Sequence, residues 1–152
     1  MATRYFEDVK IGDTAEFGSK TLSREEIIAF AKKYDPQPFH IDEEAAKSSI
    51  YGDIIASGWH TAAVTMRMMV DNMIDTKASL GSPGVDNLRW HKPVRPGDTL
   101  RVRTEVIDKK RSRSRPNMGT IFGKLEVINQ QDEVVMSFNS IGMTLARTNK
   151  PE

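Results

Sequence analysis

The stretch YDPQPFHID, residues 34–42, places a carboxylic acid and an imidazole five positions apart with two prolines between them. The two groups are Asp35 and His40, and both can exchange protons with a bound water. Proline disfavours a helix at and just before its own position, so we expect the stretch to be extended. Both side chains could then face one pocket. The alternative is structural, with Asp35 as the residue that ends a helix and His40 as a turn residue bonded to a backbone carbonyl.

A second candidate site is the pair Ser57-Gly58, which stands where a long apolar helical pattern begins. Ser57 is a suitable N-cap. The first turn of a helix has unpaired N–H groups and a partial positive charge. Glycine lets a ligand carbonyl approach the backbone closely. These properties suit the binding of a negatively charged oxygen.

Three helices are expected around these residues. Ser23 and Glu26 form a capping box that begins a helix over 24–34, and Pro36 ends it. Asp42 is the expected N-cap of a short second helix. The third runs over roughly 58–75, about 27 Å. Its expected buried face consists of Trp59, Ala62, Ala63, Met66, Met69, Val70, Met73 and Ile74.

The second half of the chain alternates apolar and polar residues, which is typical of strands. Strands are expected at 14–20 and within 84–94, 98–111, 119–130 and 133–147. The last four, separated by turn signals, predict an antiparallel meander. The predicted class is therefore α+β, a single domain over residues 1–152 with a sheet curled around the long helix.

Charge and composition exclude several function classes. Lys and Arg total 22 and Asp and Glu total 21, a net charge of +1, which argues against nucleic acid or a membrane surface as partner. The absence of cysteine excludes disulfides and thiolate chemistry. With no apolar segment near the N-terminus and none of membrane-spanning length, we expect a cytoplasmic protein.

One basic cluster and two further histidines are additional candidates for sites. The cluster holds Arg111, Arg113 and Arg115 and is either a solvated loop or a contact for coenzyme A phosphates. His60 and His91 lack the close spacing of metal ligands, so no metal site is expected.

Three segments together resemble one protein family: YDPQPFHID, ASGWHTAAVTMRMMVD and LRWHKPVRPGDTL. The resemblance, over roughly residues 5–147, is to the MaoC-like acyl dehydratases, which are similar to the (R)-specific enoyl-CoA hydratases and have the hotdog fold. The most specific part is the D-x-x-P-x-H pattern from Asp35 to His40. Gln37 stands where Asn is common in such hydratases, so the resemblance does not specify the substrate.

This resemblance implies an activity and its site. Asp35 and His40 would hold the water that adds across the C2=C3 bond of a trans-2-enoyl thioester, and the Gly58 N–H would bind the thioester oxygen. The thioester would be that of coenzyme A or an acyl carrier protein, no cofactor would be needed, and a homodimer or higher homo-oligomer would form.

Two other functions stay open from the sequence. One is a hotdog acyl-CoA thioesterase, in which Asp35 or another carboxylate activates water at the thioester carbonyl. The other is a non-catalytic module that binds acyl thioesters.

Overall fold

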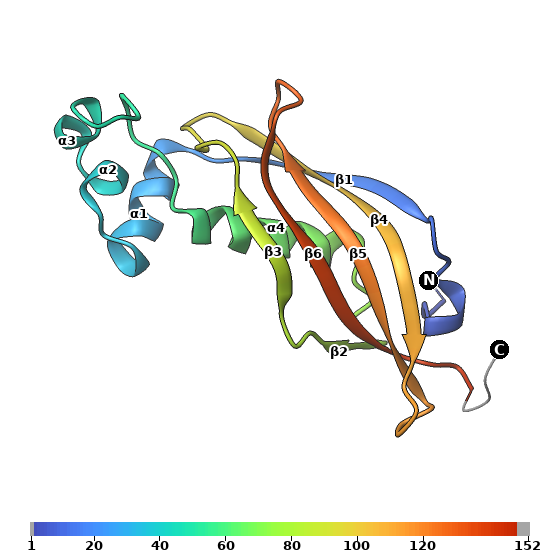
Figure 1. Cartoon of the computed structure of the whole chain (residues 1–152). Coiled ribbons are helices and arrows are strands. Elements are labelled where there is room, and N and C mark those ends of the chain that lie inside the picture. The colour runs from blue at the N-terminus through green and yellow to red at the C-terminus, as the bar shows by residue number, and fades with distance from the viewer. Residues whose placement is uncertain (1, 149–152) are drawn as a thin grey trace.

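A curled antiparallel sheet lies against one long helix, with three shorter helices gathered beyond one end of the sheet (Figure 1). The computed structural model describes residues 2–148. Its elements are η1 (Phe6–Asp8), β1 (Thr14–Thr21), α1 (Arg24–Tyr34), α2 (Pro38–Ile41), α3 (Glu43–Lys47), α4 (Gly58–Asn72), β2 (Ser79–Gly81), β3 (Val85–Trp90), β4 (Thr99–Arg111), β5 (Met118–Ile128) and β6 (Val134–Leu145). The predicted α+β class is confirmed.

The strand order is β1-β4-β5-β6-β2, with β3 also paired to β6, and every pairing is antiparallel. Strands β4, β5 and β6 form the predicted meander. The prediction is wrong for β3, which joins β6 instead of β4. The reason is that β1 already pairs along the other edge of β4, so the chain must cross the sheet between β3 and β4. The short strand β2 was not predicted.

The long helix α4 begins at Gly58 as predicted, with the Ser57 side chain as its N-cap, but it ends at Asn72 instead of near residue 75. Its buried residues are His60, Thr61, Thr65, Met68 and Met69. The predicted buried face is right in part, since Met69 is buried and Ala62, Met73 and Ile74 pack against the core.

The apolar residues of that predicted face are partly at the surface, since Trp59, Met66 and Val70 are 60%, 50% and 41% exposed. The buried threonines allow the helix to lie close to the sheet. The Thr65 hydroxyl donates to the Thr61 carbonyl at 2.7 Å, so its burial leaves no donor unpaired. Helix α4 therefore has a second apolar stripe that faces away from the core.

The short helices follow their predicted caps. Ser23 and Glu26 form the capping box of α1, and Asp42 caps α3 through the Glu44 and Ala45 N–H groups. The prediction of an extended stretch is wrong from Pro38 onward, because Pro38 opens the helical turn α2, where a missing N–H costs nothing. Among residues 2–148, no helix is long and apolar enough to cross a membrane.

Candidate active site

Asp35 and His40 lie side by side in the structure. His40 Nε2 is 3.3 Å from Asp35 Oδ2, and the two side chains are 5% and 17% exposed. Asp35 is the C-cap of α1, and His40 lies in the single turn of α2. The break between the helices turns both side chains toward one another, as the spacing predicts. The pair is shielded yet retains some contact with solvent.

The other ring nitrogen of His40 identifies the tautomer. His40 Nδ1 lies 2.7 Å from the Ile55 carbonyl oxygen. A carbonyl only accepts hydrogen bonds, so Nδ1 carries a proton. In the neutral ring Nε2 is then unprotonated, and its lone pair is on the side of Asp35. In this tautomer the ring atom that faces the carboxylate is a hydrogen-bond acceptor.

Asp35 is held as a carboxylate by neighbouring donors. Gln37 Nε2 donates to Asp35 Oδ1 at 2.7 Å. This bond and a hydrogen bond from the Ser57 side chain keep the pKa of Asp35 below its ordinary value, because both favour the charged form. Partial burial acts in the opposite direction. Asp35 is therefore ionised at neutral pH.

Ser57 joins this pair to the start of the long helix. Its side chain is fully buried, hydrogen-bonds with Asp35 and accepts the Trp59 N–H at 3.2 Å. Among the hydrogen bonds of residues 2–148, none uses the Gly58 N–H. A backbone donor at a helix N-terminus is thus left for a ligand next to Asp35 and His40, which we call the dyad.

Trp90 of β3 covers Gly58 from the other side. Its indole N–H donates to the Gly58 carbonyl at 3.0 Å. A Cβ on residue 58 would lie 2.4 Å from Trp90 Cε2, so only glycine fits here. The Trp59 and Trp90 rings meet edge to face, with centroids 5.2 Å apart.

The three arginines are not brought to the dyad within the chain. They lie at the hairpin between β4 and β5, at the far end of the sheet from α1–α3 (Figure 1). Arg111 is ion-paired with Glu7 at 3.4 Å and donates to the Pro116 and Thr148 carbonyls. Arg113 and Arg115 are exposed.

The remaining histidines lie apart from the dyad. His60 is buried with its ring stacked on Phe30, at 4.5 Å between centroids, and its Nδ1 has no hydrogen-bond partner. His91 is exposed, and its Nε2 bonds to the Ser137 hydroxyl at 2.7 Å. Within the part of the chain that the structure describes, no three His, Asp or Glu side chains cluster as metal ligands would.

Three contributors to the site were missed in the sequence. One is Gln37, although an amide two residues from a carboxylate is a signal for its donor role. Ile55 and Trp90 reach the site through tertiary contacts, and no local pattern predicts such contacts.

Asp35 and His40 can hold one water between them, and the Gly58 N–H can bind an oxyanion. Unprotonated His40 Nε2 and the Asp35 carboxylate both accept, so a water that touches both is oriented and can lose a proton to either. The Gly58 N–H is free to stabilise negative charge beside it.

The chain is similar to known proteins over most of its length. A family model described as a MaoC like domain matches residues 6–127. The crystal structure of a MaoC-like dehydratase from Rhodospirillum rubrum has a TM-score of 0.89 and 38% identity, covering 95% of this chain and 99% of that chain. The (R)-specific enoyl-CoA hydratase of Rhodospirillum rubrum is 31% identical over 111 residues, 70% of this chain and 72% of that protein.

The fold comparison adds a larger relative. A protein of Mycobacterium tuberculosis with a double hotdog fold has a TM-score of 0.80 at 21% identity, and it aligns with 99% of this chain but 47% of its own. The predicted hotdog fold is confirmed, since one such unit is half of that molecule. The chain therefore belongs to the MaoC-like family of hydratases and dehydratases.

Proposed function

We propose that this protein reversibly hydrates a trans-2-enoyl thioester to the 3-hydroxyacyl thioester. The observation that carries the proposal is the contact between Asp35 Oδ2 and His40 Nε2, 3.3 Å apart and shielded from solvent, beside the start of α4. Family membership supports the reaction class, and the substrate and the residue roles are the proposal.

The dyad would activate the water. Its oxygen attacks C3 of the enoyl group while one of its protons passes to Asp35 or His40. The same proton, or one exchanged with it, is then delivered to C2, so that water adds across the double bond without a redox change. The Ile55 carbonyl keeps His40 in the tautomer that can accept this proton. No metal or organic cofactor enters the balance.

The Gly58 N–H would act on the other end of the reacting system. As water attacks C3, negative charge moves onto the thioester oxygen. A donor fixed at that position is worth about 2.7–4 kcal/mol in other oxyanion holes. Ser57 supports this role because it caps the helix and holds Asp35 at the same time.

The proposed carrier of the acyl group is coenzyme A, or alternatively an acyl carrier protein. The related Rhodospirillum rubrum hydratase is named for an enoyl-CoA substrate. Of the three arginines considered for phosphate contact, Arg113 and Arg115 are exposed, whereas Arg111 would first have to leave Glu7. We therefore assign any phosphate contact to Arg113 and Arg115, with a phosphate that reaches the hairpin end of the sheet.

A homodimer is the proposed assembly. The exposed stripe of α4, comprising Trp59, Met66 and Val70, is apolar, and Val85 and Trp90 on β3 are also exposed. The double hotdog relative carries two such units in one chain. A second copy would cover these apolar surfaces. Because Trp90 also contacts Gly58, the site would lie beside the subunit interface.

Incubation with crotonyl-CoA and with 3-hydroxybutyryl-CoA tests the activity. We expect the conjugated enoyl absorbance to disappear with the first and to appear with the second, without release of free thiol. Thiol release would instead indicate a thioesterase. Binding without either change, over a series of acyl chain lengths, would indicate a non-catalytic module.

Two substitutions test the dyad. Asp35→Asn keeps the shape but loses the negative charge, and His40→Ala removes the imidazole. Each should lower kcat by about 10²–10⁴-fold. Circular dichroism and the oligomer mass serve as controls for folding. If either variant keeps near-normal turnover of a good substrate, the dyad assignment fails.

A further inference from the structure

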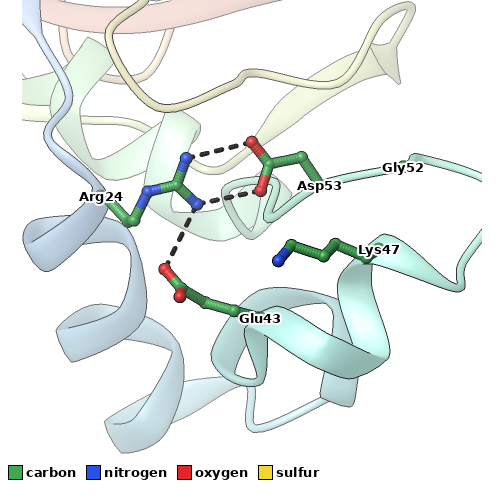
Figure 2. Close-up of a pocket in the computed structure, with 5 residues that line it drawn as sticks. All are labelled: Arg24, Glu43, Lys47, Gly52 and Asp53. Atoms are coloured by element: carbon green, nitrogen blue, oxygen red, sulfur yellow. Dashed lines mark hydrogen bonds and ion pairs between the residues drawn. The ribbon is translucent and has the colours of Figure 1, made fainter.

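The first residue of α1 is clamped to the segment that leads into α4. Arg24 donates from both terminal nitrogens to Asp53, at 2.9 Å and 3.0 Å, in a two-pronged contact (Figure 2). A third group, Glu43 of α3, lies 3.6 Å from Arg24. Asp53 Oδ1 also accepts the Ile54 N–H at 2.7 Å. The pair thus joins the helix to the backbone of the following segment.

Residues 53–57 form the backbone support of the dyad, and after Asp53 each of them is buried. The Ile55 N–H donates to the Phe39 carbonyl at 3.2 Å, and the Ile55 carbonyl accepts from His40 at 2.7 Å. Ser57 bonds to Asp35. This segment, which we call the support segment, therefore contacts both dyad residues within three positions.

The ion pair between Arg24 and Asp53, which we call the clamp, closes the chain from Arg24 to Asp53 into a ring. From Arg24 the chain runs along α1 to Asp35, through α2 with His40, and back to Asp53. Ile54 is buried in the same core cluster as Ile27 of α1, and the clamp adds a directed polar contact at the beginning of the support segment. With it, the two ends of the ring are held together by two parallel charged hydrogen bonds, which fix direction as well as distance.

We propose that Arg24 and Asp53 are positioning residues that set the distance between Asp35 and His40 through the support segment. The effect on turnover rests on the proposed hydratase function. The effect on the support segment itself does not.

The exposure of the pair separates this role from a general contribution to stability. The Arg24 and Asp53 side chains are 41% and 40% exposed, and surface ion pairs contribute little to global stability. Arg24 lowers the pKa of Asp53 to about 2, with help from the Ile54 N–H, so the pair stays charged at neutral pH. Its loss should loosen the support segment more than the domain.

The hollow beside the clamp does not have the charge of a ligand-binding site. It has a volume of about 330 Å³ and is lined by Arg24, Glu43, Lys47, Gly52 and Asp53 (Figure 2). Its two cations and two carboxylates balance. An anionic ligand there would have to displace Asp53 from Arg24, so we assign the hollow no ligand.

The test uses the full-length protein with Arg24→Gln, Asp53→Asn and the double variant. The amide oxygen introduced by Asp53→Asn can still accept the Ile54 N–H, so only the charged contact is lost. Arg103→Gln is the matched control, because Arg103 pairs with Glu126 at 2.9 Å on the sheet, away from the dyad. Hydrogen–deuterium exchange of residues 53–58 is measured together with kcat and KM for crotonyl-CoA.

We expect exchange in residues 53–58 to rise by about tenfold or more in all three clamp variants, through local opening. We expect kcat to fall by about tenfold while KM stays within about twofold, since misplaced groups affect turnover more than binding. The double variant should be no worse than either single variant, and Arg24→Lys should restore only part of the rate.

Unchanged exchange in residues 53–58 would overturn the clamp, whatever the activity. Faster exchange with unchanged kcat would overturn its positioning role. If the wild-type protein hydrates no enoyl thioester, the proposed function fails, and the exchange measurement alone still decides whether the clamp holds the support segment.

Discussion

Trp90 holds the carbonyl of Gly58, with 3.0 Å between the indole nitrogen and the carbonyl oxygen, at the point where the long helix begins. The same peptide unit is held at its other end, since the Trp59 N–H donates to the Ser57 side chain at 3.2 Å. This peptide is thus fixed from two sides, and the neighbouring Gly58 N–H remains as an oriented donor.

Gly58→Ala should damage both stability and turnover. The new Cβ would lie 2.4 Å from Trp90 Cε2, so the ring or the helix start must move. Overpacking of this kind costs about 1–3 kcal/mol. Urea unfolding measures the loss, and kcat should fall with it because the proposed oxyanion donor, the Gly58 N–H, is displaced.

A double-mutant cycle shows whether contact with Trp90 causes the loss of stability in Gly58→Ala. If contact with Trp90 is responsible, Gly58→Ala should cost clearly less stability in a Trp90→Ala background than in the wild-type protein. Equal costs in the two backgrounds would contradict this explanation and leave the glycine without a packing role.

Gln37→Ala should move the acid limb of the pH–rate profile. The Gln37 amide is the largest cause of the lowered pKa of Asp35, and the proposed reaction requires the carboxylate. Activity is therefore lost as the pH falls through the pKa of Asp35. Without the amide that pKa rises, so the loss in kcat/KM begins at a higher pH.

The control for this profile is Gln131→Ala, an exposed glutamine in the turn between β5 and β6. Gln37→Asn tests whether a shorter side chain can still donate to Asp35. If it can, its acid limb should lie between those of the wild-type protein and Gln37→Ala. An unchanged limb in Gln37→Ala would mean either that Asp35 is not the titrating group or that it need not be ionised.

Local signals in the sequence predicted the parts of the site that depend on neighbouring residues. Helix α1, its capping box and its end before Pro36 follow from contacts within a few positions, as does the Asp42 cap. The facing of Asp35 and His40 follows from the break between two helices. These features need no knowledge of the rest of the fold.

Other parts of the fold and of the site could not be predicted from local signals. The packing of α4, for example, depends on which of its two apolar surfaces faces the sheet. Helix α4 carries the stripe with Met66 and Val70 and another with Met68 and Met69, and only the second is buried. Met68 packs on Gly18 of β1, where a Cβ would lie 2.4 Å from its sulfur. Periodicity alone cannot separate a core face from a face that another surface covers. Trp90 likewise reaches Gly58 only because β3 crosses to β6.

His60→Phe should reduce the dependence of stability on pH. Burial lowers the pKa of His60 from its ordinary value of 6.5, with a smaller opposing effect of Glu26 and an added lowering by Lys20. The unfolded chain therefore binds a proton more readily than the folded one. Stability should decline as the pH falls below about 6.5, through the lowered pKa of the folded state.

Phenylalanine can keep the stacking on Phe30 but cannot titrate. Urea unfolding at several pH values between about 5 and 8 should show a shallower decline in the variant than in the wild-type protein. Parallel curves for the two proteins would contradict a neutral buried His60.

Met66→Lys combined with Val70→Asp should convert a dimer into a monomer. Both side chains belong to the exposed apolar stripe of α4. Burying two opposite charges in a dry interface costs more in desolvation than their attraction returns, whereas in water the pair costs little. Light scattering after size exclusion should give twice 17.1 kDa for the wild-type protein and 17.1 kDa for the variant.

Arg103→Gln, on the sheet, should leave the mass unchanged. A wild-type mass of 17.1 kDa at micromolar concentration would show that no second copy covers the stripe. If the monomeric variant also loses turnover while residues 53–58 keep their exchange rates, the partner subunit completes the acyl pocket beside Trp90. If turnover persists, each chain carries a whole site, and the stripe serves only to join two of them.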